Sequence, residues 1–210
     1  ITEAGAIAAP VTALDGDTVR ITATTNPGYR FLYWSIDNQQ VSAESIYEQV
    51  INCDLEITAN FEIITYSVNY RATPFNGGTA SGSITAHYMD ALTITATPTE
   101  HYHFVSWEDG STANPRIVTI TSDTTFTALF ETDKFTLTVM SSDSALGSVT
   151  GGGVYEYGVN VMITAWPVAH HHFTGWQDGN TTNPRTVVVT SDSLFIASFA
   201  PDQYNIVVAP

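Results

Sequence analysis

The sequence predicts an all-β chain, built as a tandem array of small modules of about 70 residues with mostly antiparallel strands. Two observations support this prediction. Trp107 and Trp176 lie 176 − 107 = 69 residues apart, and Tyr66–Lys134 overlays Phe135–Gln203 without a gap. Apolar residues also alternate with Thr in short runs, which is typical of half-buried strands, and these runs return in each copy. A fixed period of this length indicates an array in which each repeat is one small structural unit.

The repeat divides the chain into three copies and the start of a fourth. The predicted parts are residues 1–65 (repeat 1), 66–134 (repeat 2), 135–203 (repeat 3) and 204–210 (the start of a further repeat). Repeat 1 lacks the first strand. Trp34 precedes Trp107 by 107 − 34 = 73 residues, whereas Phe61 precedes Phe130 by 130 − 61 = 69, so repeat 1 carries a four-residue insertion, placed within Ile36–Cys53. We expect the chain to be a segment of a longer array.

Each module begins with a short strand and a glycine-rich turn. In repeat 2 the first strand is predicted at Tyr66–Tyr70, and Asn76-Gly77-Gly78 supplies the turn. Alternation predicts the next strand at Leu92–Ala96, where Thr fills the intervening positions because its branched side chain suits a pleat and its hydroxyl tolerates water. The same strand returns at Val161–Ala165 and at Val19–Ala23.

The second half of each module leads from a tryptophan to a strand that ends in Ala-x-Phe. Asp109-Gly110 and Asn114-Pro115 predict turns after Trp107. A penultimate strand is predicted at Arg116–Thr121, and the closing strand of repeat 2 covers Phe126–Phe130. The equivalent closing strands are Phe195–Phe199 and Leu55–Phe61.

Two local details have more than one interpretation. Phe104 and Trp107 have an odd spacing, which places them on opposite faces of a regular strand. A bulge just before the Trp would bring both rings inward; alternatively, one ring packs in the core and the other against the neighbouring repeat. Val41–Val50, in the repeat that carries the insertion, is the nearest approach to a helix and could hold about one turn.

Composition argues against several classes of partner. Six basic residues against 21 acidic ones give a net charge of −15, which disfavours nucleic acid and anionic membranes, because both attract Lys and Arg. We interpret the acidic surface as solvated; the alternative is a face that collects cations or a basic partner. With 43% hydrophobic residues the chain can fill small cores. Cys53 is the only cysteine, so no disulfide forms within the chain, and no apolar run is long enough to insert in a membrane.

Histidines are the first candidates for a metal site. His101, His103 and the run His170–His172 could bind a metal ion, since alternate residues of a strand share a face. Repeat 1 has Gly28 and Arg30 at the first two positions. Because a duplicated site should keep its ligands together with a carboxylate or a Cys, we expect exposed histidines and no metal site.

The acidic turns are the second candidates. Asp109-Gly110 with Asn114, and Asp178-Gly179 with Asn183, offer the oxygen ligands from which calcium sites are built. Each turn supplies only one or two carboxylates, which is too few for tight binding, and Asp-Gly is typical of a turn. We expect no metal and no cofactor, with calcium at these turns as the open alternative.

Aromatic residues fall into two classes. Rings that recur at one position in each copy are predicted to form the module cores: Phe31, Trp34, Phe61, Phe104, Trp107, Phe130, Phe173, Trp176 and Phe199. Rings that do not recur are candidates for ligand contact, because an exposed ring can stack on a sugar or anchor a partner: Trp166, Tyr102 and Phe75. In repeat 2, Thr97 stands at the position of Trp166.

No set of residues resembles a catalytic site. The Ser residues lie in polar turns or strands without the elbow and the partners that nucleophilic catalysis needs. No glycine-rich loop leads into a helix, so a nucleotide-binding loop is absent from the sequence pattern. An enzyme needs different residues in different roles, whereas duplication multiplies one set. We therefore expect no enzymatic activity.

The combined pattern resembles a known family. It joins Phe104–Trp107, Asp109-Gly110, Asn114-Pro115 and Ala128–Phe130 in one order, and it returns across nearly the whole chain. This order is similar to the divergent internalin-type B-repeat of bacterial surface and secreted proteins. The resemblance implies small β-rich modules strung along extracellular proteins as stalks or adhesive segments. It also implies an alternative fold, a β-grasp-like module with a short helix, and it brings no catalytic residues.

These observations predict a non-catalytic structural and adhesive repeat segment, a stalk or spacer that presents weak binding surfaces at the bacterial cell surface or outside the cell. The alternative is a dedicated module that binds a glycan or a host protein through the aromatics that do not recur. The expected partners are the neighbouring repeats of the same chain. We expect a monomer, with no nucleic acid bound and no membrane insertion within this segment.

Overall fold

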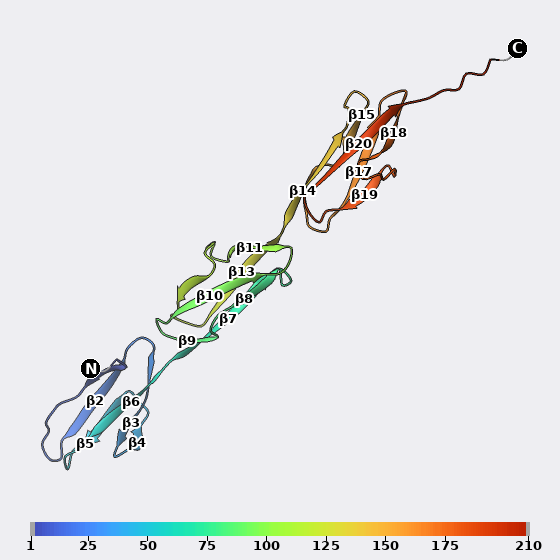
Figure 1. Ribbon diagram of the computed structural model, residues 1–210. Helices are drawn as coiled ribbons and strands as arrows, with labels where there is room; N and C mark the ends of the chain where they lie inside the picture. The colour runs from blue at the N-terminus through green and yellow to red at the C-terminus, as the bar shows by residue number, and fades with distance from the viewer. Residues whose placement is uncertain (1–2, 209–210) are drawn as a thin grey trace. The chain divides into compact units, whose positions relative to one another are not determined.

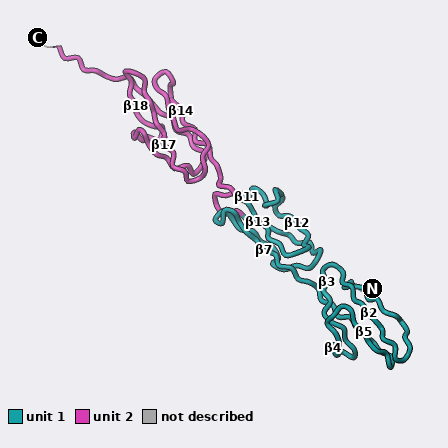
Figure 2. Tube along the Cα trace, turned by 180° about the vertical axis from the view of Figure 1, so that it is seen from behind, with its two compact units in different colours: residues 1–97, 104–129 teal, residues 98–103, 130–210 magenta. Residues whose placement is uncertain are grey.

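A computed structural model describes residues 3–208, and all regular structure in this range consists of β-strands (Figure 1). The all-β prediction is confirmed. A helix long and apolar enough to cross a membrane is not found among the described residues. The chain divides into two compact units (Figure 2), Ile1–Thr97 with Phe104–Leu129 and Pro98–His103 with Phe130–Pro210.

Repeat 3 contains two small sheets that share one apolar core. Its strands are β14 (Lys134–Ser141), β15 (Gly147–Thr150), β16 (Gly153–Glu156), β17 (Asn160–Pro167), β18 (His171–Trp176), β19 (Arg185–Val188) and β20 (Ser193–Pro201). One sheet has the order β16-β14-β20-β18 and the other the order β15-β17-β19. Within the first sheet, the opening strand β14 runs parallel to the closing strand β20. The remaining printed ladders of this repeat are antiparallel.

Alternation decides which side of each strand is buried. On β17, Val161, Ile163 and Ala165 are 7%, 0% and 2% exposed, while Met162 and Trp166 between and beyond them are 62% and 58% exposed. The inward residues pack with Leu137 of β14 and with Trp176 of β18 in one cluster. The period of two that predicts the strand therefore also predicts its buried face.

Repeat 2 has the same arrangement. Its strands are β7 (Thr65–Thr73), β8 (Gly78–Ser81), β9 (Thr85–His87), β10 (Ala91–Pro98), β11 (Tyr102–Trp107), β12 (Arg116–Thr119) and β13 (Thr124–Thr132). The sheet orders are β11-β13-β7-β9 and β12-β10-β8, and β7 runs parallel to β13. Each strand of repeat 2 thus has a counterpart in repeat 3 at the 69-residue shift.

Repeat 1 departs from this arrangement at two points. Its strands are β1 (Gly5–Ala8), β2 (Thr18–Thr25), β3 (Tyr29–Ile36), β4 (Gln39–Ser42), β5 (Ile46–Val50) and β6 (Ile57–Ile63), in sheets β1-β2-β5 and β4-β3-β6. The insertion lengthens β3 and turns it back into β4 through Asp37 and Asn38, whose φ angles are 49° and 63°. Asp and Asn tolerate this left-handed region, which two-residue hairpin turns require. The second departure is that the described part of repeat 1 has no counterpart of β7 and β14.

The helical interpretation of Val41–Val50 is wrong. This segment contains the end of β4 and all of β5, and β5 pairs with β2 from Thr18↔Val50 to Thr22↔Ile46. Pairing with β2 satisfies the backbone of β5, and its branched Ile46 and Val50 suit a strand. The β-grasp-like alternative with a short helix is likewise not the fold of the described residues.

A bulge brings both rings of the Phe-x-x-Trp motif into the core, as the first of the two interpretations predicts. The register of β18 against β20 shifts between Phe173 and Gly175, and the rings of Phe173 and Trp176 lie 5.3 Å apart, centroid to centroid. In repeat 1 the register of β3 shifts between Phe31 and Tyr33. The corresponding rings of repeats 1 and 2 are 5.3 Å and 5.6 Å apart.

Each of the three recurring tryptophans is anchored in the same way. Trp34 and Trp107 are 0% exposed and Trp176 is 3% exposed. Their indole N–H groups donate to the backbone oxygens of Glu44, Ala113 and Thr182, at 3.0 Å in every case. A buried indole needs such a partner. The loop after each Trp therefore folds back over the ring, and it does so even in repeat 1, where the loop carries the insertion.

Candidate ligand-binding surface

The outward face of the three-stranded sheet is where the repeats differ most. In repeat 3 this face carries the side chains of β17 that point away from the core. Trp166 is 58% exposed and lies opposite Ser148 of β15, whereas Thr164 lies opposite Thr150. Met162, which is 62% exposed, lies opposite Thr186 of β19. An indole thus stands on a sheet surface surrounded by hydroxyl groups.

The equivalent face of repeat 2 carries hydroxyl groups and no aromatic ring. Thr97 replaces Trp166 and Thr93 replaces Met162. The exposed apolar residue there is Ile117, 73% exposed, opposite Thr93. The inward face is meanwhile preserved, since Ile94 is as buried as its counterpart in repeat 3.

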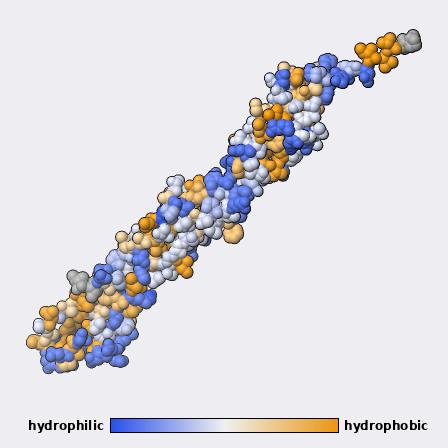
Figure 3. Space-filling model, in the orientation of Figure 1, coloured by the Kyte–Doolittle hydropathy of each residue, from blue (hydrophilic) through white to orange (hydrophobic). Residues whose placement is uncertain are grey.

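Repeat 1 has a third kind of surface on the same face. Thr24 takes the position of Trp166, while Arg20 and Glu48 lie opposite each other between β2 and β5. The outward face is therefore indole-rich in repeat 3, hydroxyl-rich in repeat 2 and charged in repeat 1. In Figure 3 hydrophobic and hydrophilic residues are interspersed on the visible face of both units.

The other two predicted contact residues do not share the surface of Trp166. Tyr102 is partly buried on β11, in a different sheet from β17. Phe75 is 93% exposed in the turn between β7 and β8, and it belongs to the first compact unit, whereas Trp166 and Tyr102 belong to the second. Trp166 is the one of the three that is both well exposed and supported by a regular strand.

The histidines are engaged in local contacts. The ring of His101 stacks on that of Tyr157, with centroids 3.4 Å apart. His103 Nδ1 lies 2.9 Å from Asp133 Oδ1, and His172 Nδ1 lies 3.0 Å from Asp202 Oδ1. In the part of the chain that the structure describes, no group of three or more His, Cys, Asp or Glu side chains is arranged to hold a metal ion.

The acidic turn of repeat 2 forms an ion pair with a mostly buried arginine. Arg116 Nη1 donates to Asp109 Oδ2 at 2.6 Å, and the Ser111 N–H donates to Asp109 Oδ1 at 3.1 Å. The Arg116 guanidinium lies 5.2 Å from the ring centroid of Trp107 and 5.7 Å from that of Phe126. The hydrogen bond from Arg116, followed by that from Ser111, holds the pKa of the Asp109 carboxyl below its usual value.

Repeat 3 reproduces this ion pair. Arg185 Nη1 donates to both carboxylate oxygens of Asp178, at 2.9 Å and 2.8 Å, and the guanidinium lies 4.9 Å from the ring centroid of Phe195. The hydrogen bond from Arg185 lowers the pKa of the Asp178 carboxyl. Sequence reasoning missed the role of these arginines as partners of the acidic turns. The signal was the seven-residue spacing from Asp to Arg, which is the same in both copies.

The geometry favours binding over chemistry. The carboxylates of the acidic turns are already used by arginines, and the exposed residues of the outward face are Trp, Met, Thr and Ser, which suit stacking and hydrogen bonding.

Comparison with known proteins now places the chain. No curated protein and no solved structure matches it. The family model of the divergent InlB B-repeat domain matches three consecutive stretches, residues 2–65, 66–134 and 137–203. These stretches cover most of the chain, and the resemblance inferred from the Phe-x-x-Trp, Asp-Gly and Ala-x-Phe pattern is confirmed. The chain belongs to the divergent InlB B-repeat family.

Proposed function

We propose that the chain is a non-catalytic repeat segment of a bacterial surface or secreted protein, in which a common frame presents a different surface in each repeat. One observation carries this proposal: the inward residues of the repeats are nearly interchangeable, whereas the outward residues at the same positions change from Trp to Thr. Family membership supports the extracellular location. The engagement of the turn carboxylates by Arg116 and Arg185 supports the absence of catalysis.

Two roles are compatible with this frame. In the first, the segment is a spacer that holds other parts of the protein apart and binds weakly along its length. In the second, repeat 3 is a dedicated binding module for a glycan. The exposed indole of Trp166 favours the second role for this one repeat, because a sugar ring stacks on an aromatic face while its hydroxyls bond to groups such as those of Thr164 and Ser148.

A glycan array with purified protein separates the two roles. If repeat 3 binds a glycan, the wild-type chain gives reproducible signals that Trp166→Ala removes and Trp166→Tyr partly retains, since Tyr keeps a ring for stacking. Ile117→Ala is the matched control, because Ile117 is an exposed apolar residue on the same face of repeat 2. A chain that gives no signal, or a signal that Trp166→Ala leaves unchanged, supports the spacer role.

A further inference from the structure

Repeat 1 lacks one strand of the frame that the other repeats share. In repeats 2 and 3 the opening strand, β7 or β14, lies between the closing strand and β9 or β16. Within residues 3–208, β6 of repeat 1 has β3 on one side and no strand on the other. Its first paired residue is Ile57, whereas β13 and β20 begin two positions earlier, at Thr124 and Ser193. The closing strand of repeat 1 is therefore shorter on the side where the neighbour is missing.

The missing strand leaves the core of repeat 1 open. Val68 of β7 and Leu137 of β14 are each 2% exposed, so they fill the core of their repeats. The closing-strand alanines Ala128 and Ala197 are 0% exposed in those repeats, whereas the equivalent Ala59 is only partly buried.

A groove of about 400 Å³ lies at the open edge. Its floor includes the core residues Ile21 and Trp34, and its walls include Ala13 on one side and Ile57 on the other. Ala13 is equivalent to Ala86 of β9, and Ile57 is equivalent to Phe126 of β13. The groove thus lies between the counterparts of the two strands that flank β7 in repeat 2.

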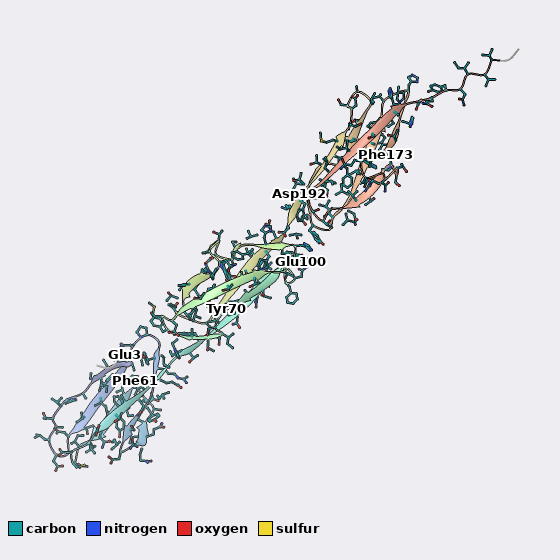
Figure 4. The ribbon with its side chains drawn as sticks, in the orientation of Figure 1. Glu3, Phe61, Tyr70, Glu100, Phe173 and Asp192 are labelled. Carbon is teal, nitrogen blue, oxygen red and sulfur yellow. The ribbon has the colours of Figure 1, made fainter. Side chains whose placement is uncertain are left out.

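Asp54 shows that the groove is built for a strand. Its counterparts Asp123 and Asp192 each accept a hydrogen bond, through Oδ1, from the backbone N–H of the second residue of the opening motif: Ser67 at 2.8 Å and Thr136 at 2.7 Å. Asp192 is labelled near the lower end of repeat 3 in Figure 4. Asp54 lines the groove and has no such partner within the described chain. Its carboxylate is placed to accept a backbone N–H that repeat 1 does not supply.

The chain also holds a strand without a sheet. Tyr204–Val208 repeats the pattern of Tyr66–Tyr70 and Phe135–Val139, but it forms no strand among the described residues. Ile206, the counterpart of the buried Val68 and Leu137, is 89% exposed. The last turn of chain in Figure 3 is correspondingly coloured as hydrophobic.

We propose that the groove of repeat 1 is an acceptor for the Tyr204–Val208 segment of a second copy of this chain. The segment adds to β6 as a parallel strand, with Ile206 opposite Leu55 and the Asn205 N–H bonded to Asp54, as the registers of β7–β13 and β14–β20 dictate. Strand addition of this kind gains affinity from main-chain hydrogen bonds and specificity from alternate side chains. Each copy has one donor and one acceptor, so the contact is head-to-tail. The inference goes beyond the proposed function and does not depend on glycan binding, and it replaces the sequence-based expectation of a monomer.

Light scattering on the 210-residue chain, from about 1 µM to about 1 mM, tests the proposal. The expected result is concentration-dependent self-association that Ile206→Asp weakens at least about tenfold, because a charge replaces a buried apolar side chain. Both Ile206 and the matched control residue Met162 are exposed in a single copy, so neither Ile206→Asp nor Met162→Asp threatens the fold. A chain that stays monomeric throughout, or association that Ile206→Asp leaves unchanged, overturns the proposal.

Two further variants locate the acceptor. A copy of residues 134–142 fused directly before Ile1 has the spacing to β1 that β14 has to β15, so it should fill the groove from within the chain and abolish self-association. Persistent association of this fusion protein would contradict the assignment of the groove. The predicted register also places Tyr204 opposite Cys53, the only cysteine. Mild oxidation of Tyr204→Cys should give disulfide-linked oligomers through Cys53 that disappear in the double variant with Cys53→Ser; their absence, or their survival in the double variant, would contradict the register.

Discussion

Asn183 is predicted to close the sheet of repeat 3 with its side chain. Its amide Nδ2 donates to the Ala165 carbonyl oxygen at 2.7 Å, and its Oδ1 accepts the Ala165 N–H at 2.9 Å. Ala165 is 2% exposed, so both backbone groups are largely shielded from water. The side chain therefore takes the place of a neighbouring strand at this point of β17. Asn114 makes the same two bonds to Ala96 in repeat 2.

Replacing Asn183 by Ala leaves one buried donor and one buried acceptor without partners. At about 1–3 kcal/mol for each such group, with partial rescue by water, we expect the free energy of unfolding of repeat 3 to fall by about 2–4 kcal/mol. Asn183→Asp is the sharper variant. An ionised carboxylate still accepts from the Ala165 N–H, but it cannot donate, and it faces the carbonyl oxygen of Ala165.

The Asp variant also makes a prediction about pH. Only the protonated carboxyl can donate to the Ala165 carbonyl, so folding favours protonation and raises the pKa of this carboxyl above its unfolded value of about 3.9. The stability deficit of Asn183→Asp relative to wild type is therefore largest at neutral pH. It shrinks as the pH falls through the folded-state pKa and is smallest below the unfolded value.

Urea unfolding followed by circular dichroism, at pH 7 and near pH 3, measures both variants against wild type. Asn69→Ala is the matched control, since this exposed Asn on β7 makes no side-chain hydrogen bond within the described chain. Loss of less than about 0.5 kcal/mol in Asn183→Ala, or an Asp variant whose deficit does not depend on pH, would refute the role of Asn183 as a substitute strand.

Two more predictions concern the acidic turn and a glycine. Because Arg185 lowers the pKa of Asp178, this pair contributes stability that is present above the unfolded pKa of about 3.9 and is lost as the pH falls through the lower folded value; melting temperatures from about pH 5 to pH 2 should show this loss in wild type and not in Asp178→Asn. Gly28 has a φ of 87°, and an added Cβ would lie 2.4 Å from Tyr88 Cβ, so Gly28→Ala should lower the melting temperature more than Gly110→Ala, whose φ of 82° is similar but whose Cβ would meet nothing within 4 Å; equal effects would contradict the steric account.

The strands and their buried faces were predictable because they depend on local information. Alternation places Val161, Ile163 and Ala165 on one side of β17 whatever its neighbours are, and the 69-residue period carries the same assignment into the other copies. The bulge before the Trp followed from the odd spacing of Phe and Trp. Val41–Val50 was ambiguous because its apolar spacing alone does not separate a strand from a short helix, and pairing with β2 decides the matter.

Pairing direction and long-range partners were not predictable in this way. The parallel alignment of the opening strand β14 with the closing strand β20 joins segments more than 50 residues apart, and no local pattern specifies it. The same limit applies to Asp54, whose importance appears only when Asp123 and Asp192 are seen bonded to the opening strands. The arginine at the end of each Asp-Gly loop was visible in the sequence, but its position against the Trp107 ring was not.

The central claim is that the inward face of each repeat builds the fold while the outward face is free for binding. Trp166 and Trp176 test it most directly, because they are the same residue type in the same repeat, 58% and 3% exposed. Urea unfolding of the two Ala variants is the measurement. The account predicts that Trp176→Ala lowers the free energy of unfolding by about 3–5 kcal/mol and that Trp166→Ala changes it by less than about 0.5 kcal/mol. Comparable losses in the two variants would contradict the division between frame and surface.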